Sequence, residues 1–247
     1  MSYITDILTD PGGRKTNQDY SGFQESEPFA CWVVADGLGG HRGGESASRL
    51  AVKIILSEFM RQPEMSTQSL TGYFKAAQDA ILREQQIDPL LCSMRTALVL
   101  LITSPEGAMW AHVGDCRLYH FHGGRIVFQT KDHSVPQVMV DAGDIKPQEI
   151  RNHEDRNRLL RTLGHENDLR PTVERSAHPV RPGDAFLLCT DGFWEYVLET
   201  EMAVDLARAR EPASWLNLMT KRLLARVGND YDNYTAIAIF KTPGDFS

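Results

Sequence analysis

The 247-residue sequence has no long apolar run and no basic cluster. No stretch approaches the ~20 apolar residues that a membrane-spanning helix needs, and the N-terminal segment lacks the basic start and apolar centre of a signal peptide. The net charge of -7 argues against a nucleic-acid partner, because binding to phosphate backbones requires a basic face. We therefore expect a cytoplasmic protein that binds neither membranes nor nucleic acid.

Paired cysteines are also missing. The four cysteines have no Cys-x-x-Cys spacing, and Cys31 and Cys189 lie in apolar runs, which favours buried, reduced thiols. A cysteine-dependent phosphatase needs an arginine six positions after its nucleophile. The residues six positions after Cys31, Cys92, Cys116 and Cys189 are Gly37, Leu98, His122 and Glu195. The absence of arginine from all four positions excludes this enzyme class.

Short β-branched or aromatic segments, separated by Gly, Pro or Asp, predict seven strands. They span Phe29–Ala35, Ala97–Thr103, Met109–Val113, Arg117–Phe121, Arg125–Thr130, Ala185–Thr190 and Tyr234–Phe240. Gly123-Gly124 predicts a hairpin turn between two of them, so we expect antiparallel sheets.

Apolar residues at helical spacing predict two pairs of helices. The early pair covers Glu45–Arg61 and the segment Leu70–Ile81; the later pair runs from Thr200, as N-cap, to Arg210 and from Pro212 to Leu223. This order predicts an α/β (α+β) fold, a four-layer α-β-β-α sandwich of two antiparallel sheets flanked by helix pairs. We expect one domain over residues 1–247, with a polar, weakly periodic surface flap at 134–166 that faces the substrate.

Aspartates stand at the ends of several predicted strands. Asp36, Asp115 and Asp191 each follow an apolar strand, and Asp232 precedes the strand that begins at Tyr234. In antiparallel neighbours such positions lie on the same rim of a sheet, so the carboxylates could converge. Converging carboxylates either become protonated or bind cations, and oxygen-only ligands select Mg²⁺ or Mn²⁺.

The alternative is that each Asp-Gly pair is a simple turn, which is the better interpretation for either pair alone. The glycine-rich run 37–44 favours a functional site, because glycine lets the backbone approach a ligand or metal closely. This run directly precedes a predicted helix, whose N-terminus favours anions.

Seven motifs in register resemble the metal-dependent protein phosphatase family, also called type 2C, and in particular its stand-alone bacterial catalytic domains. They are Gly13-Arg14-Lys15-Thr16-Asn17-Gln18-Asp19, Asp36-Gly37-Leu38-Gly39-Gly40-His41 with Gly44-Glu45, Gly114-Asp115-Cys116-Arg117, Lys131-Asp132-His133-Ser134, the segment 156–164, Thr190-Asp191-Gly192 and Asp232-Asn233-Tyr234-Thr235. The resemblance spans nearly the whole chain.

The resemblance implies two Mn²⁺ or Mg²⁺ ions. Asp36 would bridge both, Asp191 and Asp232 would complete one site, and the Gly37 carbonyl would contribute to the other. Asp19 would bind metal directly or through water. Arg14 would hold the phosphate, a task that suits a guanidinium able to donate two hydrogen bonds. Arg14, Asp36 and Asp191 are thus the expected catalytic residues.

A third, weaker metal site is also implied, with Asp115, Asp191 and Glu195 as ligands. Glu195 departs from the family, which more usually has Asp at this position. Leu38 is a second departure, since eukaryotic members place there a histidine that protonates the leaving group. Leucine cannot donate a proton, so this step falls to metal-bound water or to His41.

The expected reaction is in-line attack of a metal-activated water on phosphoserine or phosphothreonine, without a covalent intermediate. The expected partners are phosphoproteins, with a cognate Ser/Thr kinase and its substrates among them. One alternative is a zinc hydrolase using His120 and His122, although these fit surface histidines of a hairpin without a nearby third ligand. Another is a non-catalytic phosphoprotein-binding module.

Overall fold

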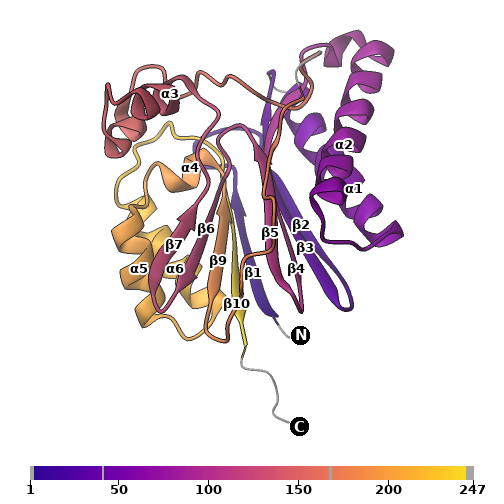
Figure 1. Ribbon diagram of the computed structural model, residues 1–247. Helices are drawn as coiled ribbons and strands as arrows, with labels where there is room; N and C mark the ends of the chain where they lie inside the picture. Colours follow the sequence, from indigo (N-terminus) through magenta and orange to yellow (C-terminus); the bar gives the residue numbers. More distant parts are fainter. Residues whose placement is uncertain (1–2, 41, 167–168, 243–247) are drawn as a thin grey trace.

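Two five-stranded antiparallel sheets form the centre of the protein (Figure 1). The computed structural model describes residues 3–40, 42–166 and 169–242. Sheet A has the order β1-β10-β9-β6-β7, and sheet B has the order β2-β3-β4-β5-β8. The strands of sheet A are β1 (Tyr3–Asp10), β10 (Tyr234–Lys241), β9 (Ala185–Cys189), β6 (Arg117–His122) and β7 (Arg125–Gln129). Those of sheet B are β2 (Tyr20–Ser26), β3 (Phe29–Leu38), β4 (Arg95–Ser104), β5 (Gly107–Val113) and β8 (Thr172–Val173).

Each sheet is covered on its outer face by a helix pair. Helices α1 (Gly43–Arg61) and α2 (Thr67–Ile87) pack on sheet B, while α5 (Glu199–Arg208) and α6 (Pro212–Leu224) pack on sheet A. The remaining helical segments are the 3₁₀ helices η1 (Pro89–Leu91) and η2 (Pro147–Asn152) and the short helices α3 (Val135–Ala142) and α4 (Asp191–Trp194). The predicted four-layer sandwich is therefore confirmed.

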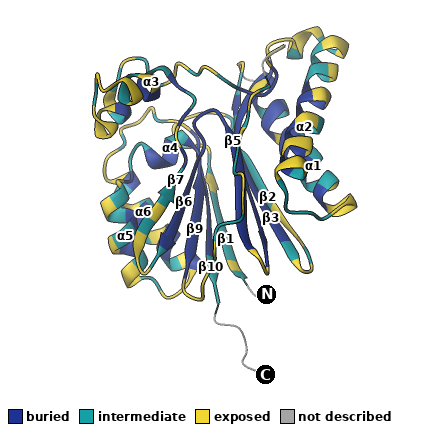
Figure 2. Cartoon of the chain, viewed as in Figure 1, coloured by how far each residue is buried: buried dark blue, intermediate teal, exposed yellow. Residues whose placement is uncertain are grey.

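Strand β3 illustrates why the sheets lie at the centre. Cys31, Val33 and Ala35 point to the helices α1 and α2, whereas Trp32 and Val34 point into the layer between the sheets. Successive side chains of a strand alternate between faces, so a strand buried on both faces is continuously apolar. Figure 2 shows buried residues along the central strands and exposed residues on the outer sides of the helices.

The seven predicted strands are all present, and the hairpin turn has positive φ at Gly123 (57°) and Gly124 (73°), as a two-residue type I′ turn requires. The sequence analysis missed β1, β2 and β8. It also placed a helix N-cap at Thr200, which was wrong. Leu198 is the N-cap, because the Glu201 carboxylate accepts a hydrogen bond from its backbone N–H at 3.0 Å and the helix begins at Glu199.

The prediction of buried thiols holds for three of the four cysteines. Cys31, Cys116 and Cys189 are buried and unpaired, whereas Cys92 is exposed directly after η1. The flap, residues 134–166, contains α3 and η2 and lies at one end of the sandwich, over the ends of the strands (Figure 1). No helix in the described part of the chain is both long enough and apolar enough to cross a membrane.

Candidate metal centre

Five aspartates meet at the end of the sandwich that carries the flap. Asp36 lies within β3, two residues before its end, and not in a turn, because the pairing of β3 with β4 continues to Leu38 and Arg95. Burial and the charges of four other aspartates raise the pKa of Asp36, so each of these four carboxylates lies within electrostatic reach of Asp36. These four are Asp19, before β2; Asp115, after β5; Asp191, after β9; and Asp232, before β10. The convergence expected from strand ends is therefore present.

The raised pKa values of four of these aspartates show that their ionised forms are unfavourable when they lie close together. Burial and the neighbouring charges raise the pKa of Asp36 and of Asp115 well above the ordinary range, that of Asp19 to about 7 and that of Asp191 to about 6. Each value reflects first the loss of solvent and then repulsion between carboxylates. Divalent cations would remove both penalties.

The donor set fits Mn²⁺ or Mg²⁺, because it consists of carboxylate oxygens without His or Cys. One oxygen, Oδ1 of Asp115, is buried and has no hydrogen-bond partner among the described residues. Across residues 3–40, 42–166 and 169–242, however, no three Asp, Glu, His or Cys side chains converge closely enough to hold a cation as they stand. Binding would therefore have to draw the carboxylates together.

Threonine hydroxyls position two of the aspartates. Thr190 Oγ1 donates to Asp19 Oδ2 at 2.9 Å and accepts from the backbone N–H of Thr235 at 3.0 Å. Thr96 Oγ1 donates to the Asp36 carbonyl at 2.6 Å. These threonines had no role in the sequence analysis. Only the Thr-Asp-Gly motif, in which Thr190 precedes Asp191, pointed to one of them.

Asn233 joins the beginning of the chain to its last strand. Its Oδ1 accepts from the backbone N–H of Gln18 at 2.8 Å, and its Nδ2 donates to the carbonyls of Pro11 and Thr16 at 2.8 and 3.0 Å. This amide thereby holds the loop 11–19 beside the aspartates. Its membership of the last motif was the only sequence signal.

The glycine-rich run allows a close approach of backbone, as predicted, but the observed neighbour is protein. A Cβ at Gly37 would lie 2.1 Å from the Gly44 carbonyl oxygen, and one at Gly44 would lie 2.5 Å from Gln18 Nε2. Only glycine fits at either position. The end of β3 can therefore lie directly against the first turn of α1, which keeps Asp36 and the Gly37 carbonyl at the rim.

Arg14 lies beside one of the predicted metal ligands. Its Nε is 3.4 Å from Asp232 Oδ1 and its Nη1 is 3.8 Å from Asp230 Oδ1, with about half of the side chain exposed. The guanidinium is thus at the solvent side of the aspartate cluster, where a phosphate can reach it. His41, the expected alternative proton donor, lies outside the described residues.

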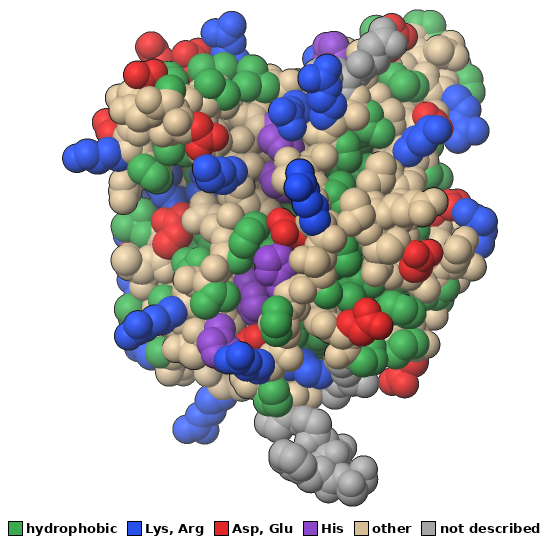
Figure 3. Space-filling model, viewed as in Figure 1, with side chains coloured by type: hydrophobic (Ala, Val, Ile, Leu, Met, Phe, Trp, Pro, Cys, Tyr) green, Lys and Arg blue, Asp and Glu red, His purple; other side chains and the backbone are tan. Residues whose placement is uncertain are grey.

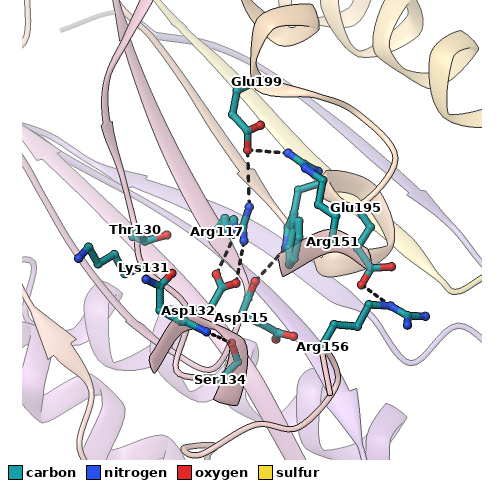
Figure 4. A network of polar contacts seen from close by, with 12 residues as sticks. Asp115, Arg117, Thr130, Lys131, Asp132, Ser134, Arg151, Arg156, Glu195 and Glu199 are labelled. Carbon is teal, nitrogen blue, oxygen red and sulfur yellow. Dashed lines mark hydrogen bonds and ion pairs between the residues drawn. The ribbon is translucent and has the colours of Figure 1, made fainter. Parts of the chain in front are cut away.

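Glu195 has a partner that the sequence analysis did not anticipate. Its Oε1 accepts from Arg156 Nε, in the flap, at 3.0 Å (Figure 4). Burial and the charge of Asp191 raise the pKa of Glu195 to about 7, while Arg156 opposes the rise. The carboxylate expected at a third cation site therefore already forms an ion pair.

Two further ion pairs lie beneath the flap (Figure 4). Arg117 donates to Asp132 through Nε at 2.8 Å and Nη2 at 2.7 Å, and its guanidinium stacks 3.4 Å from the Trp194 ring centroid. Arg151, in the flap, donates to Glu199 at 2.6 Å. The first pair joins β6 to the loop that leads into the flap, and the second joins the flap to α5.

Of the two histidines of the zinc alternative, His122 is a partly exposed residue of the β6–β7 hairpin, as expected, whereas His120 is not a surface residue. His120 is buried, and both imidazoles lie against Asp184, with His120 Nε2 and His122 Nδ1 at 3.0 and 2.6 Å from its carboxylate oxygens. A carboxylate does lie nearby, contrary to the expectation. It engages both rings directly, and Arg181 Nη1 is 3.3 Å from His122 Nε2, which opposes a cation there.

The family model described as Protein phosphatase 2C matches residues 13–228. The chain belongs to the protein phosphatase 2C family. It is 32% identical over 218 residues to the serine/threonine phosphatase stp of Listeria welshimeri, covering 85% of this chain and 84% of that relative. It is 31% identical over 244 residues to PstP of Mycobacterium tuberculosis, a match that covers 96% of this chain and 46% of that longer relative.

Solved phosphatase structures of this family have the same architecture. The crystal structure of the serine/threonine phosphatase PstP/Ppp of M. tuberculosis superposes with a TM-score of 0.84 at 28% identity, over 98% of this chain and 99% of that one. The catalytic domain of PstP in complex with two manganese ions gives a TM-score of 0.80 at 27% identity, over 98% and 100%. The predicted family and fold are thereby confirmed.

Proposed function

We propose that this protein is a Mn²⁺- or Mg²⁺-dependent phosphatase that hydrolyses phosphoserine and phosphothreonine in proteins, with residues 1–247 as one catalytic domain. The gathering of aspartates from distant parts of the chain around Asp36 carries the proposal. Burial and mutual repulsion raise the pKa of four of them, Asp19, Asp36, Asp115 and Asp191, which is the signature of a site that needs positive charge. Family membership and the names of its relatives support the same activity.

Two cations would be held by Asp36 between them, by Asp191 and Asp232 at one position, by the Gly37 carbonyl at the other, and by Asp19 directly or through water. When bound, such ions supply an activated water and neutralise charge on the phosphoryl group during in-line hydrolysis, without a phosphoenzyme. Asp115, Asp191 and Glu195 are the proposed ligands of a weaker third ion.

Phosphate binding and protonation of the leaving group are the remaining steps. Arg14 would hold the phosphate oxygens, because it lies at the solvent side of the aspartates and has a planar pair of donors. Leu38 is half-buried at the end of β3 and cannot transfer a proton. Leaving-group protonation is therefore assigned to water at the centre or to His41.

The substrates we propose are phosphoproteins, which the names of the relatives as serine/threonine phosphatases support. We propose a cognate Ser/Thr kinase and its targets among them. We assign selection among phosphorylated substrates to residues of the flap, because the flap lies over the end of the sandwich where the aspartates converge (Figure 1).

The test uses protein stripped of metal with EDTA and then supplied with Mn²⁺. Wild type should release phosphate from phosphoserine and phosphothreonine peptides only with the metal. Asp36→Asn and Asp191→Asn should reduce kcat/KM by more than the ~10–100-fold typical of residues that merely support metal ligands. Asp79→Asn, on the exposed face of α2, is the matched control.

Calorimetric titration with Mn²⁺ gives a second readout. Asp36→Asn and Asp191→Asn should lower the affinity for Mn²⁺ as well as kcat/KM. Near-wild-type turnover in both Asp36→Asn and Asp191→Asn would overturn the assignment. Phosphopeptide binding without any Mn²⁺-dependent release in wild type would instead support the non-catalytic binding module.

A further inference from the structure

A groove of about 540 Å³ borders the aspartate cluster. One wall comes from the end of β3 and the beginning of β4, with Leu38 and Arg95, and the other comes from flap residues, with Leu159, Arg161 and Thr162. None of the ten residues that line it is acidic. Figure 3 shows the upper surface hollowed between the flap and the α1–α2 side, with Lys or Arg side chains on its border. The groove is thus basic in a chain of net charge -7.

The strand register places Arg95 next to the metal centre. Asp36 pairs with Ala97 and Leu38 pairs with Arg95, so all four side chains emerge on the same face of sheet B. Ala97 belongs to the cluster between the sheets, which fixes this face as the inner one. Arg95 lies two residues beyond the position opposite Asp36, about 7 Å along the strand.

The flap wall is fixed to the same strand. The backbones of Thr96 and Leu163 exchange hydrogen bonds at 3.2 and 2.9 Å, and the Thr96 hydroxyl bonds the Asp36 carbonyl. Arg161 lies two residues before Leu163 and lines the same groove as Arg95. The two arginines therefore share one groove beside the aspartate cluster.

Neither arginine is paired with a carboxylate within residues 3–40, 42–166 and 169–242. Arg161 is half-buried and donates from Nη1 to the Arg170 carbonyl at 3.3 Å, and Arg95 is exposed. Three other arginines at this end of the molecule form ion pairs: Arg117 with Asp132, Arg151 with Glu199 and Arg156 with Glu195. A half-buried guanidinium that forms no ion pair with the described carboxylates is suited to an anion that arrives with the substrate.

We propose that Arg95 and Arg161 bind a second anionic group on the substrate, a carboxylate or a second phosphate, two or three residues from the phosphorylated serine or threonine. This spacing follows from the ~7 Å offset and the ~3.3 Å that each residue of an extended peptide spans. The inference rests on the proposed protein phosphatase activity. It makes this groove a determinant of selectivity among phosphorylated sites.

The test compares phosphoserine peptides of one sequence that carry Ala, Glu or a second phosphoserine at the second or third position on either side. With Mn²⁺ present, kcat/KM should be about 5–10-fold higher for the best acidic peptide than for the Ala peptide, mainly through KM, as one charge-assisted contact provides. The Glu and phosphoserine arms separate the two sources of the anion.

Arg95→Ala and Arg161→Ala should each bring the ratio of acidic to neutral peptide close to one, while Arg95→Lys should keep part of it. Arg125→Ala, at the opposite end of β6–β7, is the matched control and should leave the ratio unchanged. Thermal unfolding of each variant verifies the fold. Added salt should lower the wild-type ratio, because screening weakens exposed charge pairs.

Equal kcat/KM for Ala, Glu and phosphoserine peptides in wild type would overturn the proposed anion site in the groove. It would leave the proposed phosphatase activity unaffected. A proportional fall for every peptide in Arg95→Ala would do the same, since it would indicate a general effect on catalysis. Failure of wild type to release phosphate from any of these peptides would instead overturn the proposed function and, with it, this inference.

Discussion

Arg117 and Asp132 form a buried ion pair with two parallel hydrogen bonds, of 2.8 and 2.7 Å, between the beginning of β6 and the loop that leads into the flap. Their side chains are only 5% and 2% exposed. Both side chains are buried, and the Trp194 ring also covers the guanidinium. Removal of either partner would therefore leave the other charge without solvent. This geometry makes the pair a structural unit beneath the active end of the molecule.

Arg117→Ala is expected to lower the free energy of unfolding by about 3–5 kcal/mol, because it leaves the Asp132 charge buried without a partner. Urea unfolding measures the loss. The double variant Arg117→Met/Asp132→Leu should lose less than the two single variants together, as removal of both charges leaves none unpaired. Arg49→Ala, which breaks an exposed pair with Glu45, should change stability by less than about 0.5 kcal/mol. Equal small losses in Arg117→Ala and Arg49→Ala would contradict the expectation.

The crowded aspartates predict an unusual pH dependence of the metal-free protein. Burial and mutual repulsion raise the folded-state pKa of Asp19 to about 7 and of Asp191 to about 6, against about 3.9 in the unfolded chain. Between these values the folded state binds more protons, so stability is lost as pH rises from about 4 through about 7. The total loss should be on the order of a few kcal/mol.

Thermal unfolding in EDTA at pH 5 to 8 measures this decline. Saturating Mn²⁺ should abolish or reverse it, since cations stabilise the ionised cluster. Asp36→Asn should make the metal-free decline shallower by removing one of the repelling groups. An EDTA-treated wild type that gains stability toward pH 8 would show that the carboxylates do not repel one another.

The pair between Arg156 and Glu195 predicts competition with a third cation. A carboxylate that already accepts from a guanidinium at 3.0 Å gives up this contact when it binds metal. Arg156→Ala should therefore raise the affinity of the weakest Mn²⁺ site by about 10-fold, the equivalent of one charge-assisted contact. Equilibrium dialysis at millimolar Mn²⁺ measures the stoichiometry.

Arg158→Ala is the control for this experiment, because Arg158 is a neighbouring flap arginine whose ion pair with Asp155 is long, at 4.0 Å. It should leave the stoichiometry unchanged. Identical Mn²⁺ binding in wild type and Arg156→Ala would exclude the competition.

Most of the strands that could be predicted are buried on both faces, such as β3 and β9, whose apolar runs leave little alternative. The edge strand β7 was predicted from the hairpin turn that joins it to β6. The missed strands are at or near sheet edges. In β2 polar residues interrupt the pattern, and β8 has only two residues. Their pairing partners, and not their own composition, make them strands. The positions of Asp191 and Asp232 followed from strand ends, whereas Asp36 lies two residues inside the end of β3.

The supporting contacts could not be predicted in the same way. Thr190 bonds Asp19 across 171 positions of sequence, and Arg156 reaches Glu195 across 39. The misinterpretation of His120 has the same cause, since Asp184, its hydrogen-bond partner, is 64 positions away. A single hydroxyl, amide or imidazole leaves no pattern in the sequence that identifies its hydrogen-bond partner, because the topology of the whole fold determines which residue lies beside it.

The first strand, β1, has β10 as its only neighbour in sheet A. During synthesis on the ribosome, residues 3–10 therefore cannot pair as a strand until residues 234–241 have been made. Because Asn233 also fastens the loop that carries Asp19, the catalytic end assembles last. A nascent chain halted before Asn233 would have most of its core and no working enzyme, which makes activity depend on synthesis of β10.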